Sequence, residues 1–255
     1  MSHLQLFLRR PIAELRLSNP DKLNALTVDM MAQLVEHCDL IERRTEVRAV
    51  ILTAEGDRAF CAGADISAWS DLPPSDFMRH WVRDGHRVFD RLARLSKPTI
   101  AAIAGHAFGG GLELAAACDV RIMHPGAVLA LHEAGIGVVP GWSGTQRLSR
   151  LLPEPVLKEM ALFGRKLTAE RAYGLGFVAE VATNTREAAL SMAESMLAVQ
   201  SKSSEVTKYM IHSAVGEDRA ALIEAMGSGM MAAGADRTDG VTSLIDKRKP
   251  DFPGV

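Results

Sequence analysis

The stretch that decides the fold is GHAFGGGLELAAACD, residues 105–119. It follows TIAAIA, residues 99–104, an apolar run that predicts a buried strand. The three consecutive glycines permit close backbone approach and leave N–H groups open to a ligand. The segment after them predicts a helix that is apolar on every side, with Glu113 as its one charged residue. An unpaired buried charge is costly, so Glu113 needs a reason to be there. Either it takes part in the chemistry of a functional site, or it has a structural role, as the cap of a loop or the partner of an arginine.

The rest of the chain alternates strands and helices up to about residue 200, which predicts a largely parallel α/β core. Apolar runs at 4–8 and 12–17 predict an antiparallel pair of strands, and residues 49–53 predict a parallel strand covered on both faces. Beyond residue 200 the pattern is helical only. We therefore expect an α/β core at residues 1–199 and a helical C-terminal region at residues 200–255.

Composition excludes several classes of protein. The net charge of −2 argues against nucleic acid or a membrane surface as partner, and no stretch is long and apolar enough to span a bilayer. Three cysteines, Cys38, Cys61 and Cys118, sit singly in apolar surroundings, as is typical of reduced thiols. We expect a cytoplasmic protein with no membrane association.

A second segment of small residues, Ala62–Asp65, also follows a strand-like run. If its backbone and that of the glycine triplet face one point, their N–H groups form an oxyanion hole. Glu133 lies twenty residues after Glu113, again in apolar and glycine-rich surroundings. Two such carboxylates suggest a general acid and a general base. The histidines show no metal-ligand spacing, so we predict no metal site, and we interpret His132 as structural.

These segments, with several others, resemble the enoyl-CoA hydratase/isomerase (crotonase) superfamily over nearly the whole chain. The resemblance implies an α/β fold built as a spiral of ββα units. It also implies that the C-terminal helices form a homotrimer or a homohexamer. The motifs that carry it are NPDKLNAL (19–26), AFCAGADI (59–66), KP (97–98), GGGLELA (109–115), CD (118–119), PG (140–141), GTQRL (144–148) and DKRKP (246–250).

The resemblance further implies a site for an acyl-CoA substrate. The backbone N–H groups of Ala64 and Gly110 would hold the thioester carbonyl, and Glu113 and Glu133 would hold a water molecule between them. No cofactor is expected beyond the CoA that forms part of the substrate. The other positions implied in substrate binding are Arg58, Ala62, Asp65, Ile66, Ser67, Gly109, Gly141 and Lys247.

The predicted activity is that of an enoyl-CoA hydratase, with Glu113 mainly as base and Glu133 mainly as acid. Two alternatives stay open: an isomerase that converts 3-enoyl-CoA into 2-enoyl-CoA, and a catalytically silent acyl-CoA-binding relative. Retention of both glutamates favours hydration. Trp142 and Ser143 stand where the family often has small residues. We expect Trp142 to point along the acyl channel and to exclude long acyl chains.

Overall fold

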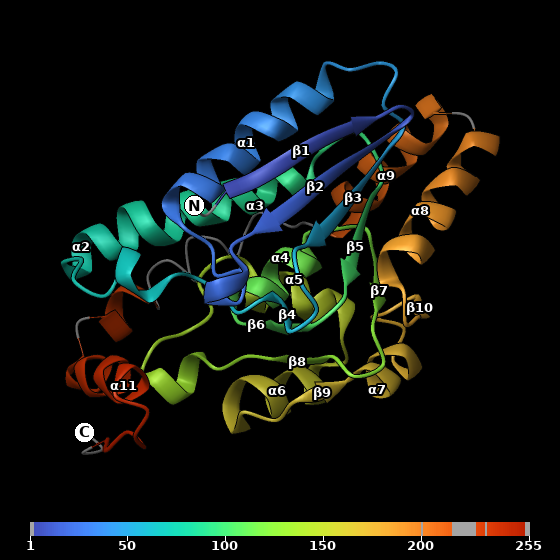
Figure 1. Ribbon diagram of the computed structural model, residues 1–255. Helices are drawn as coiled ribbons and strands as arrows, with labels where there is room; N and C mark the ends of the chain where they lie inside the picture. The colour runs from blue at the N-terminus through green and yellow to red at the C-terminus, as the bar shows by residue number, and fades with distance from the viewer. Residues whose placement is uncertain (1–2, 200, 216–227, 233, 253–255) are drawn as a thin grey trace.

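The computed structural model describes residues 3–199, 201–215, 228–232 and 234–252 of the chain. Its strands form two sheets (Figure 1). The larger sheet has the order β1 (His3–Arg9), β2 (Ile12–Ser18), β3 (Ala49–Ala54), β5 (Thr99–Ile103), β7 (Val120–Met123) and β10 (Glu180–Val181). The smaller sheet has the order β4 (Ala59–Cys61), β6 (His106–Phe108), β8 (Val128–Ala130) and β9 (Leu167–Thr168).

The pairing of the strands confirms the predicted parallel α/β core. Strands β1 and β2 are antiparallel, as are β8 and β9, and the remaining pairs are parallel. Strand β6 was not predicted, because its three residues lack the apolar alternation that marks a strand. It pairs with β4, which brings the segment after β4 beside the glycines after β6.

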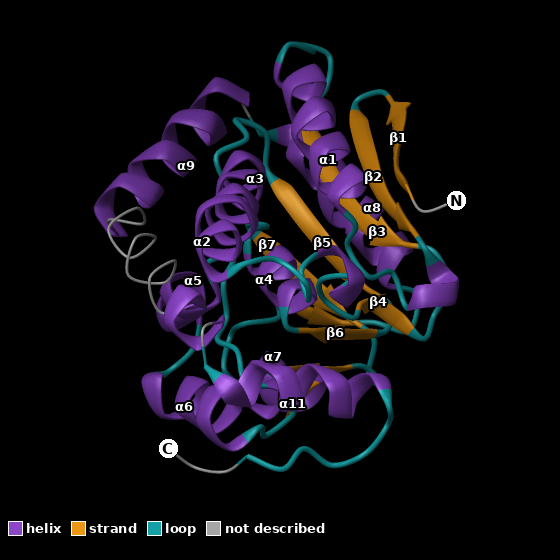
Figure 2. Cartoon of the chain, turned by 90° about the vertical axis from the view of Figure 1, so that its left-hand side faces the viewer, coloured by secondary structure: helices purple, strands orange, loops and turns teal. Residues whose placement is uncertain are grey.

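Helices cover both faces of the larger sheet (Figure 2). Helix α8 (Thr185–Ser195) packs its Ala189 and Ala193 against Ile51, Ile100 and Ile122. The other face meets the main hydrophobic core, to which α1 (Val28–Glu42), α3 (Arg83–Ala93) and α4 (Gly110–Ala116) contribute. Further helices among the described residues are α2 (Pro74–Asp76), which continues as a π-helix (Phe77–Val82), α5 (Gly144–Leu151), α6 (Glu154–Phe163), α7 (Ala169–Gly174), α9 (Ser201–Val215) and α11 (Ala235–Ile245).

Helix α4 is the centre of the molecule and is apolar on every side, as predicted (Figure 2). Every residue from Gly110 to Ala116 is buried. The polar N-terminus of this helix opens toward a cavity, and its C-terminus packs into the core. A buried helix of this kind places the side chain of Glu113 in a fixed position.

The C-terminal helix α11 folds back onto the core of its own chain (Figure 1). The Arg237 guanidinium donates to the carbonyl oxygens of Trp69 at 2.8 Å and of Ser70 at 3.2 Å, and it lies over the ring of Phe77. Residues 216–227 of the predicted C-terminal region lie outside the described residues, and the division into residues 1–199 and 200–255 stays a prediction. Within the described ranges, no helix combines the length and the apolarity needed to cross a bilayer.

A buried carboxylate in β2 ties the larger sheet to α8. Glu14 is 1% exposed and accepts hydrogen bonds from Arg186 at 2.6 Å, Arg16 at 2.8 Å and Thr53 at 2.9 Å. Burial raises the pKa of Glu14, but these hydrogen bonds outweigh burial and hold the pKa at about 2. Because this pKa is depressed, the ionised form of Glu14 stabilises the fold above its ordinary pKa of 4.5, and that stability is lost as the pH falls toward 2.

Glu14→Gln is therefore expected to lower the free energy of unfolding by about 1.5–3 kcal/mol at pH 7. The difference between variant and wild type should shrink as the pH falls from 4.5 toward 2. Urea unfolding followed by circular dichroism at a series of pH values measures it. A difference that stays constant with pH would show that the charge of Glu14 contributes nothing.

Candidate active site

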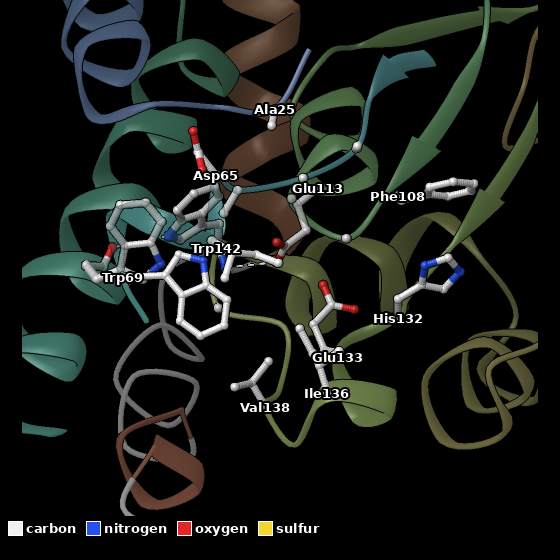
Figure 3. A pocket seen from close by; sticks show the side chains of 18 of the residues that line it. Ala25, Asp65, Trp69, Phe108, Glu113, His132, Glu133, Ile136, Val138 and Trp142 are labelled. Atoms are coloured by element: carbon white, nitrogen blue, oxygen red, sulfur yellow. Dashed lines mark hydrogen bonds between the residues drawn. The ribbon is translucent and has the colours of Figure 1, made fainter. Parts of the chain in front are cut away.

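A cavity of about 490 Å³ opens at the N-terminus of α4 (Figure 3). Two segments form one side of it, residues 62–66 after β4 and residues 108–110, which run from the end of β6 into the start of α4. Both predicted glutamates, Glu113 and Glu133, line the same cavity. Large apolar side chains form the rest of the wall, from Trp69, Phe77, Trp81, Val82, Ile136, Val138, Trp142 and Leu244.

Two backbone N–H groups meet at this wall. The Leu26 N–H donates to the Gly63 carbonyl at 2.8 Å, and the Asp65 N–H donates to the Leu26 carbonyl at 2.8 Å. These two bonds fix the backbone on either side of Ala64 without using the Ala64 N–H.

Gly110 is the first residue of α4, so its N–H has no acceptor within the helix. A Cβ atom added to Gly110 would lie 3.5 Å from the Ala64 nitrogen, which shows how closely the two segments approach. Two N–H groups placed in this way can donate together to one oxygen atom.

Glu113 is held by the loop after β8. It is 3% exposed, and its Oε1 accepts from the Trp142 N–H at 2.8 Å and from the Gly144 N–H at 2.7 Å. The sequence left open whether Glu113 serves a site or pairs with a loop or an arginine. In the structure Glu113 binds a loop, and the same side chain also faces the cavity. Gly144 is required here, because a Cβ atom at that position would lie 2.7 Å from Oε1.

Glu133 begins a short 3₁₀ turn, Glu133–Ile136, and two residues separate it from the end of β8. Its carboxylate lies over Gly109, where an added Cβ atom would be 2.8 Å from Oε1. Gly109 also has a φ of +49°, a left-handed conformation that favours glycine. The carboxylates of Glu113 and Glu133 point into the same part of the cavity (Figure 3). The arrangement can supply one carboxylate as a base and the other as an acid.

The indole of Trp142 is a fixed part of the wall. It is 3% exposed, its Nε1 donates to the Trp81 carbonyl at 3.2 Å, and its ring contacts the rings of Trp81 and Phe89 at centroid distances of 5.0 and 5.3 Å. A Cβ atom on Gly110 would lie 3.0 Å from the indole. Trp142 therefore lies between α3 and the Gly110 backbone and borders the cavity beside the paired N–H groups.

A family model described as Enoyl-CoA hydratase/isomerase matches residues 9–254. The chain belongs to this family. It is 34% identical to the short-chain-enoyl-CoA hydratase of Clostridium acetobutylicum, over 93% of this chain and 92% of that protein. It is 32% identical to the crotonyl-CoA hydratase of Syntrophomonas wolfei, over 94% of each. The crystal structure of an enoyl-CoA hydratase from Mycobacterium avium subsp. paratuberculosis superposes with a TM-score of 0.87 at 25% identity, covering 98% of each chain.

These similarities confirm the predicted family, the crotonase-type α/β fold and, at the level of the family, an enzyme of the enoyl-CoA hydratase type. An acyl-CoA substrate follows from membership of this family.

Most of the predicted site residues of this family member lie around the cavity. Those that line it are Ala62, Ala64, Asp65, Ile66, Gly109, Gly110, Glu113, Glu133 and Gly141. Three predicted CoA-binding residues are exposed and outside its lining: Arg58, in the turn before β4, Ser67, and Lys247, just after α11. Their contacts with CoA stay predictions.

Several lining residues were missed by sequence reasoning. Lys22, which lies within the NPDKLNAL motif, pairs with Asp65 at 2.8 Å at the edge of the cavity. His132, interpreted as structural from the sequence, lines the cavity and packs on the ring of Phe108 at a centroid distance of 4.7 Å. Burial, together with the nearby Lys166, lowers the pKa of His132, which favours a neutral imidazole.

Proposed function

We propose that this protein is an enoyl-CoA hydratase that adds water reversibly across the 2,3 double bond of a 2-enoyl-CoA thioester. One observation carries the proposal: two backbone N–H donors and two carboxylates line the same cavity. The donors belong to Ala64 and Gly110, and the carboxylates to Glu113 and Glu133. Membership of the enoyl-CoA hydratase/isomerase family supports it.

In the proposed reaction the N–H groups of Ala64 and Gly110 donate to the thioester carbonyl oxygen. This polarises the conjugated double bond and stabilises the negative charge that develops on that oxygen. Such donors act most strongly in a water-poor site, and the apolar wall of tryptophans supplies that environment.

The two glutamates hold the attacking water and move its protons. Glu113 removes one proton as the water oxygen forms its bond to Cβ, and the π electrons shift toward the thioester. Glu133 then delivers a proton to Cα, so that water has been added and the carbonyl is restored. We propose that these steps need no metal ion or further cofactor, because the two N–H donors stabilise the developing charge and the CoA belongs to the substrate. Arg58, Ala62, Asp65, Ile66, Ser67, Gly109, Gly141 and Lys247 are proposed to bind the substrate along its length.

The direct test is incubation of the purified protein with crotonyl-CoA. Hydration removes the conjugated enoyl thioester, so its absorbance falls, and mass spectrometry detects the 3-hydroxyacyl-CoA product. No loss of absorbance with crotonyl-CoA or with longer 2-enoyl-CoA substrates would contradict the proposal and would favour a silent acyl-CoA-binding protein.

We propose that Trp142 limits the length of the acyl chain. Trp142→Leu is expected to raise the ratio of kcat/KM for 2-octenoyl-CoA over crotonyl-CoA by about 10-fold or more, since methylene-sized differences in a pocket change discrimination by that order. Leucine keeps an apolar group against Gly110, and thermal unfolding confirms that the variant is folded. An unchanged ratio would show that another part of the wall sets the limit.

We propose that the protein assembles as a homotrimer or a homohexamer. Large apolar side chains are exposed in the single chain, among them Leu162 (66%), Phe163 (78%) and Ile245 (64%). Contiguous exposed apolar groups are typical of protein interfaces. Light scattering is expected to report a multiple of three times the 27.5 kDa chain mass, and Phe163→Glu to lower the assembled fraction. A monomer at micromolar concentration would refute the assembly.

A cytoplasmic location also remains a proposal, which the cysteines support. Cys38, Cys61 and Cys118 are free and buried. Burial raises the pKa of each of these thiols to about 12, so they remain protonated at neutral pH.

A further inference from the structure

Ser143 lies between the two residues whose N–H groups hold Glu113. Its φ of +84° and ψ of +14° are left-handed, a conformation that glycine adopts readily and serine rarely. This conformation turns the N–H groups of Trp142 and Gly144 toward the same carboxylate oxygen of Glu113. The site therefore depends on a backbone conformation that serine does not favour by itself.

A series of polar side chains from α3 and α5, outside the cavity lining, binds the Ser143 hydroxyl. Its Oγ lies 2.8 Å from Nδ1 of His86 in α3, and the His86 Nε2 lies 3.4 Å from an oxygen of Asp90. Asp90 also pairs with the Arg147 guanidinium of α5. Ser143, His86 and Arg147 are 0%, 6% and 1% exposed and the Asp90 side chain is 14% exposed, so the bond between Ser143 and His86 is shielded from water.

The chemistry of Asp90 fixes the direction of its hydrogen bond with His86. Burial raises the pKa of Asp90, but His86, Arg147 and Arg94 outweigh burial and lower it, so the group is a carboxylate at neutral pH. A carboxylate can only accept, so the His86 Nε2 carries the proton that faces it. The other ring nitrogen, Nδ1, faces the Ser143 hydroxyl and joins the imidazole to the turn.

A serine, a histidine and an aspartate in line also suggest a nucleophile, but burial excludes that use. Ser143 is fully buried and is not part of the cavity lining. Its hydroxyl therefore has no access to a thioester carbonyl, which a nucleophile must approach closely. The group acts on the backbone of its own loop.

We infer that His86 is a positioning residue for the catalytic base: through Ser143 it fixes the turn that directs the N–H groups of Trp142 and Gly144 at Glu113. This inference rests on the proposed hydratase function, in which Glu113 is the base. Asp90 orients the His86 imidazole, which binds the Ser143 hydroxyl and so fixes the backbone of the turn. The N–H groups of the turn then orient the Glu113 carboxylate. His86 itself touches no reacting atom.

Two substitutions of His86 separate its two hydrogen bonds. The amide oxygen of His86→Asn can replace Nδ1 and keep the bond to Ser143, whereas the longer side chain of His86→Gln reaches the position of Nε2 and keeps the bond to Asp90. Both remove the imidazole ring, so each is the control for the loss of packing in the other. His86→Asn is expected to retain kcat within about threefold, and His86→Gln to lose on the order of ten- to a hundredfold, with KM nearly unchanged in both.

Ser143→Ala tests the same connection from the other side and serves where His86→Gln folds poorly. It is expected to lower kcat by the same factor as His86→Gln. The double variant Ser143→Ala/His86→Gln is expected to have a kcat no lower than that of the slower single variant. Two residues of one chain of bonds give such non-additive effects. Equal kcat values for His86→Asn and His86→Gln, or fully additive effects in the double variant, would overturn the inference.

Amide hydrogen exchange of the peptide covering residues 140–147 gives a readout that needs no activity. Exchange at Trp142 and Gly144 is expected to be about tenfold faster in His86→Gln than in wild type or His86→Asn, because the turn opens more often. Equal exchange would overturn the inference. A wild type that hydrates no enoyl-CoA but shows this pattern would refute the hydratase proposal and leave the positioning of Glu113 by His86 in place.

Discussion

Replacing Glu113 by Gln is expected to lower kcat for hydration of crotonyl-CoA by about 10²–10⁴-fold, the range for loss of one general acid–base group. The side-chain oxygen of Gln can still accept from the N–H groups of Trp142 and Gly144, so the loop keeps its place. The loss would therefore reflect the missing base and not a displaced turn. Steady-state kinetics with crotonyl-CoA measures the effect, and binding of CoA, followed by calorimetry, should persist.

Glu180→Gln is the matched control for this variant. Glu180 is exposed in β10, away from the cavity lining, so the same chemical change there should leave kcat at the wild-type value. Hydration by Glu113→Gln at the wild-type rate would refute the mechanism of two glutamates. If Glu113→Gln instead retains conversion of 3-enoyl-CoA to 2-enoyl-CoA, the protein is an isomerase in which Glu113 is dispensable.

Replacing Glu133 by Gln is expected to lower hydration by a similar factor, about 10²–10⁴-fold, for a different reason. Glu133 is the proposed donor of the proton at Cα. Proton transfer between Cα and solvent should then fall together with hydration. Gln has the size and shape of Glu, so its amide can take the place of the carboxylate over Gly109 without a shift of the backbone.

Deuterium in the solvent separates the two roles. With 3-hydroxybutyryl-CoA in D₂O, the wild type should exchange one Cα proton, and Glu133→Gln should exchange it slowest of the three proteins. Product analysis by proton NMR measures this. Cα exchange that is fast in Glu133→Gln and slow in Glu113→Gln would reverse the assigned acid and base.

Sequence reasoning identified the parts of the site that are local in the chain. The apolar surroundings of Glu113 are visible in residues 110–116, and the glycines beside it are contiguous. The capping of α1 is equally local, since the Thr27 hydroxyl accepts from the Met30 N–H at 3.2 Å. Such local patterns can be predicted from the sequence, because the interacting groups lie within one or two helical turns of each other.

The rest of the site depends on contacts between distant segments, which no local pattern contains. The pairing of β4 with β6 brings Ala64 beside Gly110, and β6 itself lacks a strand pattern. His86 lies in α3 and Ser143 in the loop before α5, 57 residues apart, so their hydrogen bond forms only in the packed fold. The orientation of the Trp142 indole is likewise set by its neighbours, among them Gly85, where an added Cβ atom would lie 1.9 Å from the indole nitrogen.

The position of Leu244 in the chain has a consequence for the order in which the molecule is made. The paired backbone donors and both glutamates precede residue 134, whereas Leu244 lies 111 residues after Glu133, on the helix that Arg237 anchors to the Trp69 carbonyl. During synthesis on the ribosome, these groups and the tryptophans of the wall are therefore made well before Leu244. A nascent chain can contain the paired donors and both glutamates early, but Leu244 joins the cavity lining only after α11 has been made.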